Sequence, residues 1–364
     1  MTKISCISAR NTGCLVAVVV LCSDLIYGAS TVYQDTWLAA LMALACAVPM
    51  GLLYARIAGL FPEQGLFDLT GTLLGPRLGT VVTGLFTWYA LHVSALALRN
   101  FSEFTVDIEL QNTPHLVIMA AILSVSACLS VVSFKTMGRW ALIILTLVAA
   151  NLVFTLFITA RAMDITNLLP VLQNGLADIT WDAASIGAVA FEETVLILIV
   201  FGSFAKEESP HKAYMGGILL GGFFVLVAIL RNILVLGGNM FNASVFPSYS
   251  TVRVGQVGTF LEHIESVISF NQILLGMTKI ALCLKCSCMG TAKLLGIKED
   301  KRLVVPISLL SLALCATAFE SMQELLRFVQ AYRVYAPIFA VLLPLVLWIV
   351  AERKGRKEAV AAQN

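Results

Sequence analysis

Long runs of apolar residues recur along the chain, and short segments rich in charge, proline and glycine separate them. A helix that crosses a bilayer needs ~20 consecutive apolar residues, and the pattern predicts ten such helices. The predicted spans are 12–30, 37–60, 78–98, 115–133, 139–160, 183–204, 213–237, 264–284, 303–319 and 332–351. The pattern therefore predicts an all-α membrane protein in which 1–364 form a single transmembrane domain.

The positions of Lys and Arg in the short loops predict the orientation of these spans. Of the 24 Lys and Arg, Lys279 lies inside a span. Those that fall on the side opposite the N-terminus are Arg99, Arg161, Arg231, Arg253, Arg327 and Arg333, and all the others fall on the N-terminal side. Because cytoplasmic loops are enriched in Lys and Arg, both termini are predicted to be cytoplasmic, with a short tail at 352–364.

Composition narrows the possible functions. The chain is 59% hydrophobic and 13% charged, and its net charge of +2 gives no basic excess for a nucleic-acid partner. The cysteines lie mostly inside apolar runs, where thiols act as small hydrophobic groups, and Cys283-x-x-Cys286-x-Cys288 alone does not make a tetrahedral metal site. The usual hydrolase, nucleotide and zinc-protease motifs are absent. We therefore expect no enzyme activity, no metal and no cofactor.

Four ionisable residues fall inside predicted spans: Asp24 in the first, Glu192 and Glu193 in the sixth, and Lys279 in the eighth. Such groups cost ~2.5–3.5 kcal/mol each on insertion scales, so they are candidate functional residues. The alternative is structural: these side chains pair with neighbours or line a hydrated crevice. Adjacent residues are ~100° apart on a helix, so only one of the two glutamates is expected to face a pocket unless the helix is unwound there.

The first and sixth spans open two halves of five spans each, at about 12–160 and 183–351. Both opening spans carry polar residues in their interior. In inverted-repeat transporters, corresponding helices of the two halves are broken at the midplane, where freed backbone groups and half-helix dipoles hold the substrate. The placement predicts broken helices in spans one and six.

Two possible ion pairs and one arginine allow more specific expectations. Asp24 and Lys279 fall at similar depths, so they can form an ion pair; the alternative is that Lys279 extends to the cytoplasmic surface. Arg99 and Glu103 have the spacing of a helix-surface pair, and Arg231 is expected to be an interfacial anchor.

The loops carry a further pattern of short motifs. They are Gln34-Asp35-Thr36-Trp37-Leu38, Phe61-Pro62, Leu74-Gly75, Leu78-Gly79, Thr113-Pro114, Asp164, Asn167-Leu168-Leu169-Pro170-Val171-Leu172, Gly175, Val235-Leu236-Gly237, Phe246-Pro247, Phe260-Leu261-Glu262 and Glu265-Ser266. In this order and spacing the chain resembles the B-subunit family of spore germinant receptors, the spore permease branch of the amino acid–polyamine–organocation superfamily. The resemblance extends from about Asn11 to Ile349.

The resemblance implies a LeuT-like fold with a 5+5 inverted repeat, residence in the spore inner membrane, and assembly with an A subunit and a lipoprotein C subunit. It also implies a ligand pocket, which transfers to this chain as Cys22, Ser23, Asp24, Leu25, Gly28, Val93, Phe191, Glu192, Glu193, Thr278 and Lys279. The implied function is to bind a small nutrient, often an amino acid, and to signal germination. A proton-coupled amino acid transporter is the alternative, with Glu192 or Glu193 as the proton carrier, because receptor and transporter need the same pocket.

Overall fold

The computed structural model describes residues 6–23, 30–255, 265–319 and 321–361, and most of this part of the chain is helical. The longer helices are α1 (Ala9–Leu21), α2 (Thr36–Leu60), α3 (Leu66–Ile108), α4 (His115–Ser130), α5 (Phe134–Thr159), α6 (Leu176–Ala190), α7 (Pro210–Ala243), α8 (Pro247–Gly255), α9 (Glu265–Leu295), α10 (Val304–Ala318), α11 (Met322–Pro337) and α12 (Leu343–Ala361). Span six continues as the 3-10 helix η5 (Glu192–Ser203), and a π-helical turn, η8 (Ile338–Leu342), joins α11 to α12. Short 3-10 helices lie at η2 (Tyr33–Asp35), η3 (Ala160–Ala162), η4 (Ile165–Leu168) and η7 (Asp300–Leu303).

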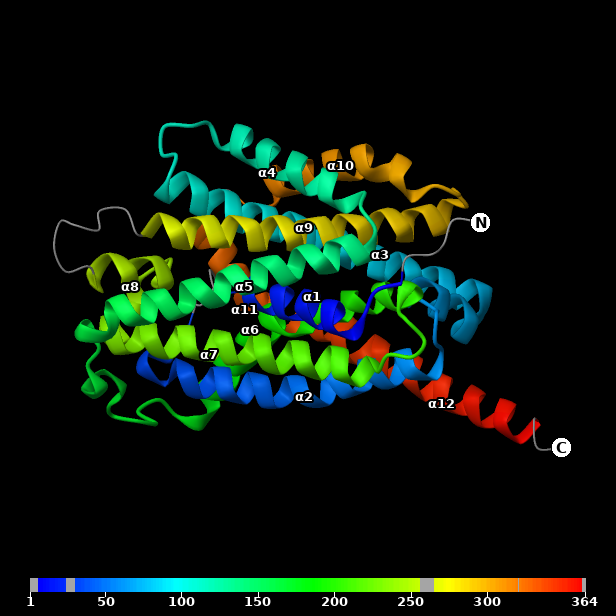
Figure 1. Ribbon diagram of the computed structural model, residues 1–364, viewed down its shortest axis with the longest axis horizontal. Helices are drawn as coiled ribbons and strands as arrows, with labels where there is room; N and C mark the ends of the chain where they lie inside the picture. Colours follow the sequence, from blue (N-terminus) through cyan, green and yellow to red (C-terminus); the bar gives the residue numbers. More distant parts are fainter. Residues whose placement is uncertain (1–5, 24–29, 256–264, 320, 362–364) are drawn as a thin grey trace.

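The helices agree with the predicted spans. In the described part of the chain, eight helical segments are long and apolar enough to cross a membrane, and the two shorter apolar helices α1 and α4 lie at predicted spans one and four. Figure 1 shows the described chain beginning, and α12 ending, at the same end of the bundle, as an even number of crossings requires. The protein is therefore an all-α integral membrane protein, and its helices are consistent with ten spans.

Local sequence determines where several helices begin and bend. The side chains of Ser8 and Ser133 accept hydrogen bonds from backbone N–H groups in the first turns of α1 and α5, as N-cap residues do. Within α3 and α7, Gly75 (φ 76°) and Gly237 (φ 71°) have left-handed backbone conformations that other residues rarely adopt, and each bends its helix. The bend at Gly75 separates the 66–74 segment from predicted span three, which begins at 78.

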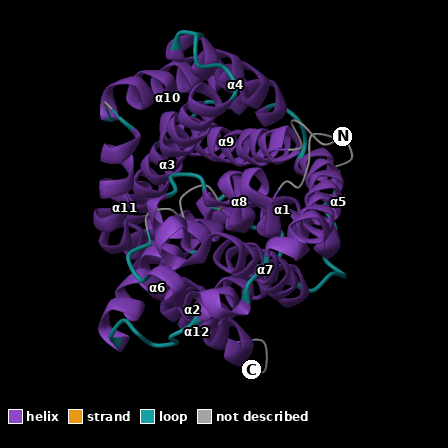
Figure 2. Ribbon diagram, turned by 90° about the vertical axis from the view of Figure 1, so that its left-hand side faces the viewer, coloured by secondary structure: helices purple, strands orange, loops and turns teal. Residues whose placement is uncertain are grey.

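The packing of the helices has an internal symmetry. Helices α1 and α2 pack on α7 and α6, whereas α3 and α4 pack on α9 and α10, so the first two spans of each half form one group and the third and fourth form another (Figure 2). Equivalent helices of the two halves make equivalent contacts: α1 packs on α7 as α6 packs on α2, and α4 packs on α9 as α10 packs on α3. Because each half has an odd number of spans, the second half enters the membrane from the opposite side. This is the 5+5 inverted repeat predicted for the fold.

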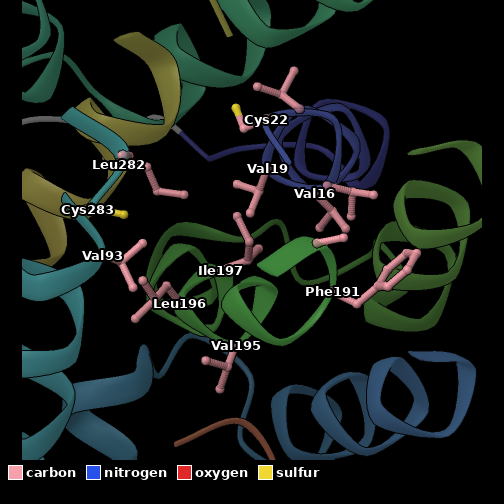
Figure 3. Close-up of a cluster of buried hydrophobic side chains, with 14 of the residues drawn as sticks. Val16, Val19, Cys22, Val93, Phe191, Val195, Leu196, Ile197, Leu282 and Cys283 are labelled. Carbon is pink, nitrogen blue, oxygen red and sulfur yellow. The ribbon is translucent and has the colours of Figure 1, made fainter. Parts of the chain in front are cut away.

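Span six runs through the centre of the molecule. Every residue from Glu192 to Phe201 is buried, and Figure 3 shows Val195, Leu196 and Ile197 of η5 in an apolar cluster with Val19 of α1. Span one approaches this centre because glycines allow α1 to pack closely on α7. A Cβ added at Gly217 would lie 2.5 Å from the carbonyl oxygen of Gly13, so only glycine fits there. The two helices that open the repeats therefore meet at the core.

Candidate functional site

Span six is interrupted at the level of its two glutamates. The α-helix α6 ends at Ala190, and the chain continues from Glu192 as a 3-10 helix. A 3-10 helix has 3.0 residues per turn instead of 3.6, so adjacent side chains are ~120° apart. Glu192 and Glu193 consequently point in different directions. The predicted break in span six is confirmed; the corresponding part of span one, which contains Asp24, Leu25 and Gly28, lies outside the described residues.

Glu193 forms a buried ion pair with Lys279 of α9. Each side chain is 5% exposed, and the carboxylate contacts the ammonium through Oε2. The second carboxylate oxygen, Oε1, accepts a hydrogen bond of 2.9 Å from the hydroxyl of Tyr332 on α11. That hydroxyl lies 3.2 Å from the hydroxyl of Tyr89 on α3. Charged and polar groups from four different helices therefore meet around one carboxylate.

This group borders a cavity with a volume of about 30 Å³ for the centres of water-sized molecules. A single water needs ~10–15 Å³ on this measure, so the cavity holds about two. Among the described residues, its polar wall consists of Cys22, Asn100, Glu193, Lys279 and Tyr332, and its apolar wall of Leu96, Ala97, Phe101, Val189, Leu325, Phe328 and Val329. We call it the Lys279 cavity.

Asn100 adds an unpartnered acceptor to the wall of the Lys279 cavity. The residue is 2% exposed, and its Oδ1 is buried without a hydrogen-bond partner among the described residues. A buried polar atom without a partner costs about 1–3 kcal/mol. A ligand with a hydrogen-bond donor would remove this cost. The cavity therefore presents a cation, an anion and an acceptor to anything that enters it.

The structure brings three of the predicted site residues to this cavity: Cys22, Glu193 and Lys279. Others lie nearby but do not line it. Val93 and Phe191 belong to the buried apolar cluster of Figure 3, and Thr278 accepts a hydrogen bond of 3.1 Å from Trp140 Nε1 on α5. Ser23 is buried, and its hydroxyl donates to the Val20 carbonyl oxygen at 2.6 Å.

Glu192 is also buried, but it does not line the Lys279 cavity. Its Oε2 has no hydrogen-bond partner in the described part of the chain. The expectation that only one of the two glutamates faces a pocket is consistent with this arrangement.

Two expectations about charged residues are corrected by burial. Lys279 does not extend to the cytoplasmic surface, because it is 4% exposed and paired with Glu193. Asp24, the partner that its depth predicted for Lys279, lies outside the described residues. Arg231 is not an interfacial anchor, because it is 3% exposed and hydrogen-bonded inside the bundle to Thr155 and Asn232.

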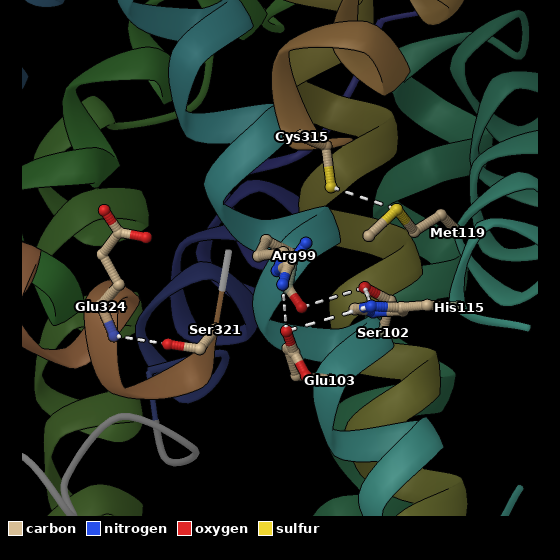
Figure 4. A network of polar contacts seen from close by, with 8 residues as sticks. All are labelled: Arg99, Ser102, Glu103, His115, Met119, Cys315, Ser321 and Glu324. Atoms are coloured by element: carbon tan, nitrogen blue, oxygen red, sulfur yellow. Dashed lines mark hydrogen bonds and ion pairs between the residues drawn. The ribbon is translucent and has the colours of Figure 1, made fainter. Parts of the chain in front are cut away.

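The Arg99–Glu103 ion pair forms as its spacing predicts, but not on the helix surface. Arg99 is 6% exposed and Glu103 9% exposed. His115 of α4 joins them, with its Nδ1 4.0 Å from Glu103 and its Nε2 2.9 Å from the Ser102 hydroxyl (Figure 4). The surface assignment is wrong because α4 and α10 cover this face of α3. The network joins α3 to α4.

Tyr332 and Asn100 are the site residues that sequence reasoning missed. Tyr332 is the first residue of predicted span ten. The ten residues before it include Glu324 and Arg327 and are too polar to have been predicted as part of a membrane span. The structure shows that α11 already begins at Met322. Asn100 lies beyond the predicted end of span three at 98, next to Arg99 and close to Ser102 and Glu103, so its amide did not stand out as a polar group inside a span.

Known transporters share this fold. The structure of Mhp1, a nucleobase-cation-symport-1 family transporter in a closed conformation with bromovinylhydantoin bound, matches with a TM-score of 0.68 at 9% identity, covering 93% of this chain and 80% of that one. MhsT in complex with L-phenylalanine matches with a TM-score of 0.54 at 8% identity, covering 94% of this chain and 95% of MhsT. At such identities the similarity concerns the fold alone. The protein is a membrane protein with the LeuT fold.

Sequence comparison identifies the family. The model of the Spore germination protein family matches residues 6–323. Spore germination protein KB of Bacillus subtilis (strain 168) is 28% identical over 346 residues, which cover 92% of each chain. The chain therefore belongs to the spore germination protein family, and the resemblance drawn from its loop motifs is confirmed.

Proposed function

We propose that the protein is the nutrient-binding membrane subunit of a spore germinant receptor. It resides in the spore inner membrane with both termini cytoplasmic, and it acts together with an A subunit and a lipoprotein C subunit. The observation that carries this proposal is the buried Glu193–Lys279 ion pair in the wall of a small cavity, at the interruption of span six. Family membership supports a role in germination.

The chemistry of the Lys279 cavity suits a small zwitterion such as an amino acid. Removing one partner of a buried ion pair leaves an uncompensated charge, which costs ~3–5 kcal/mol. A ligand that separates Glu193 from Lys279 must therefore supply both charges. An amino acid does so, with its carboxylate toward Lys279 and its ammonium toward Glu193 and the unpartnered Asn100 Oδ1.

Binding at this site would change the conformation of the protein. The cavity has room for about two water molecules, so an amino acid enters only when its walls move apart. Those walls belong to α1, α3, α6, η5, α9 and α11, which come from both repeats. A ligand that binds the expanded state more tightly shifts the population toward that state, which the partner subunits then read.

The test is the germination dose-response of spores that carry Glu193→Gln, Lys279→Met or the double variant. Spores are exposed to a panel of amino acids, and immunoblots verify that the protein is present at normal levels. The double variant keeps the cavity neutral and so preserves folding, and we expect it to abolish the response. Glu192→Gln is the matched control, because Glu192 lies outside the cavity wall, and it should retain the nutrient concentration for half-maximal response.

An unchanged dose-response in the double variant at normal protein levels would overturn the proposal. Uptake assays separate the receptor from the transporter alternative. Proteoliposomes that contain the purified protein should bind a labelled amino acid without accumulating it. Accumulation against a gradient would identify a transporter instead.

A further inference from the structure

A groove lies between α2 and α12 near the end of the bundle where both helices end. Among the described residues it is lined by Arg56 of α2 and by Trp348, Ile349, Glu352 and Arg353 of α12, and its volume is about 430 Å³ for the centres of water-sized molecules. Figure 1 shows α12 continuing past the rest of the bundle at this end. The end is cytoplasmic in the proposed orientation. We call this space the Arg353 groove.

Polar contacts hold the walls of the Arg353 groove in place. Arg56 Nε donates to Glu352 Oε1 at 2.7 Å, which joins α2 to α12. Lys354, the residue after Arg353, donates from Nζ to the carbonyl oxygen of Thr72 at 2.6 Å and so joins α12 to the first part of α3. The two helices therefore keep a fixed spacing where they leave the membrane.

Both arginines of the groove are accessible to a ligand. The Arg56 side chain is 52% exposed, and Arg353 is exposed as well. A guanidinium group has five N–H donors in a planar fork, so Arg56 can bind a second acceptor while its Nε stays paired with Glu352. Arginine forks match the oxygens of a phosphate group. The groove therefore offers phosphate-binding groups from two helices.

The surface next to the groove is apolar. Leu52 is 44% exposed and lies one helical turn before Arg56, on the side toward the membrane centre. Ile349 is 46% exposed and stands in the same relation to Arg353. Residues four apart lie on one face of a helix, so each arginine follows an exposed apolar side chain on its own face. Both arginines thus lie where an apolar surface gives way to charge, which is the depth of lipid headgroups.

Two further features agree with this depth. Trp348 lines the groove, and tryptophan rings are enriched at the level of the headgroups. The sequence also has more basic than acidic residues where span ten leaves the membrane. In 352–358 the acidic residues are Glu352 and Glu358, and the basic residues are Arg353, Lys354, Arg356 and Lys357. Basic clusters directly after a membrane span are typical of segments that contact anionic lipids.

We propose that the Arg353 groove binds the headgroup of an anionic phospholipid of the cytoplasmic leaflet. Arg56 and Arg353 contact the phosphate, and the acyl chains lie along the exposed apolar side chains of α2 and α12 toward the membrane centre. A soluble phosphate compound would leave those side chains without a partner, so the combination of charged groove and apolar surface favours a lipid.

The test uses the purified full-length protein in detergent micelles, with dioleoylphosphatidylglycerol as the probe and thermal unfolding as the readout. We expect this lipid to raise Tm in a saturable manner, because a ligand that binds only the folded state stabilises it. Two other compounds should leave Tm unchanged at the same concentration. Dioleoylphosphatidylcholine has the same acyl chains but a zwitterionic headgroup, and glycerol 3-phosphate has a phosphate group but no acyl chains.

The decisive variant carries both Arg56→Gln and Arg353→Gln. It should raise the concentration of phosphatidylglycerol for a half-maximal shift ~10-fold or more, because each basic residue near an anionic lipid contributes a factor of about five. Both side chains are exposed and the Arg56–Glu352 pair is partly in contact with solvent, so Tm without lipid should stay close to that of the unsubstituted protein.

The control carries Lys301→Gln and Arg302→Gln. It removes the same charge from exposed residues on the same side of the membrane in the proposed orientation. Arg302 Nε is also paired with a glutamate, Glu299, at 2.7 Å, but neither Lys301 nor Arg302 lines the Arg353 groove. The control should bind phosphatidylglycerol as the unsubstituted protein does.

Three results would each overturn the proposal. An equal shift with phosphatidylcholine would mean that acyl chains alone stabilise the protein, and an equal shift with glycerol 3-phosphate would identify a soluble phosphate ligand. An equal loss in the control variant would indicate general attraction to positive charge rather than a site in the groove. The assay contains no spores and no nutrient, so its result is independent of whether the protein is a germinant receptor.

Discussion

The thiol of Cys22 donates a hydrogen bond to the backbone carbonyl oxygen of Leu275, with a sulfur–oxygen distance of 3.1 Å, and so joins the end of α1 to α9. Leu275 lines a second cavity, together with Leu21 of α1 and residues of α5 and α7, whereas Cys22 lines the Lys279 cavity. The single contact therefore lies in the partition between the two. It connects α1 of the first repeat to α9 of the second.

Replacing Cys22 with alanine should lower the free energy of unfolding by about 1–2 kcal/mol, since a buried hydrogen bond is lost and a small void is left. Titration of the purified protein with a denaturing detergent measures this change. Cys46 is exposed, so Cys46→Ala is the matched control and should have no measurable effect. Equal stabilities for the two variants would show that the Cys22 contact contributes nothing.

The Glu193–Lys279 pair predicts strong non-additivity. Glu193→Gln and Lys279→Met should each lower the free energy of unfolding by ~3–5 kcal/mol, because each leaves the partner's charge buried and uncompensated. The double variant should be far more stable than the sum of the two losses implies. A double-mutant cycle on the purified protein measures the coupling. Strictly additive losses would mean that the two groups do not interact.

The sequence identifies Glu193 and Lys279 as charges inside the membrane spans, but it does not show that they pair with each other. Glu193 and Lys279 stand out because ionisable residues are rare in apolar spans. Depth along straight helices suggested Asp24 as the partner of Lys279. Depth alone cannot identify Glu193, because the face that a side chain occupies depends on the change from α to 3-10 winding after Ala190. That change is set by packing at the centre of the bundle rather than by a local motif.

The same distinction applies to the fold. Apolar runs are sufficient to find spans, so the predicted limits of α2 (Thr36–Leu60) agree closely with the structure. Apolar runs do not reveal an amphipathic helix. The first part of α11, which begins at Met322, contains charged residues and was therefore not included in the predicted span that starts at Tyr332. Apolar runs also miss burial that arises from neighbouring helices, as for Arg231.

The contact between α1 and α7 should be intolerant of side-chain volume. Gly217→Val would place a side chain against Gly13 and Val16, and we expect it to lower the free energy of unfolding by ~2 kcal/mol or more. A Cβ at the adjacent Gly216 meets no atom within 4 Å, so Gly216→Val is the control and should change stability by less than ~1 kcal/mol. Similar losses in both variants would attribute the effect to helix propensity rather than packing.

Lys285 should matter more for stability than its position just beyond predicted span eight suggests. Its ammonium donates to the carbonyl oxygens of Ser130 and Val132 at 3.0 and 2.6 Å, at the C-terminal end of α4. Lys285→Met should therefore cost ~1–3 kcal/mol, because these buried carbonyls lose a charged donor. Lys293→Met, also on α9, breaks only an exposed ion pair with Asp68 and should cost less than ~1 kcal/mol. Comparable losses, measured by thermal unfolding, would contradict the capping role.

The predicted topology can be tested by labelling. The exposed cysteines Cys6, Cys46 and Cys128 are first replaced. Cysteine at Asp178 should then react with a membrane-impermeant maleimide added to intact cells, whereas cysteine at Glu208 should react only after permeabilisation. The reverse pattern would invert the assigned orientation and with it the cytoplasmic placement of both termini.

Cys22 and Gly217 together limit how the Lys279 cavity can open. The backbone of α1 is pressed against α7 at Gly217 and Gly221, so these two helices cannot slide apart without losing that fit. We therefore expect α1 of the first repeat and α7 of the second to move as one rigid body. The hydrogen bond from Cys22 to Leu275 lies where the end of α1 contacts α9. A movement of α1 would therefore displace Leu21 and Cys22 together and change the shape of the two cavities that these neighbouring residues line.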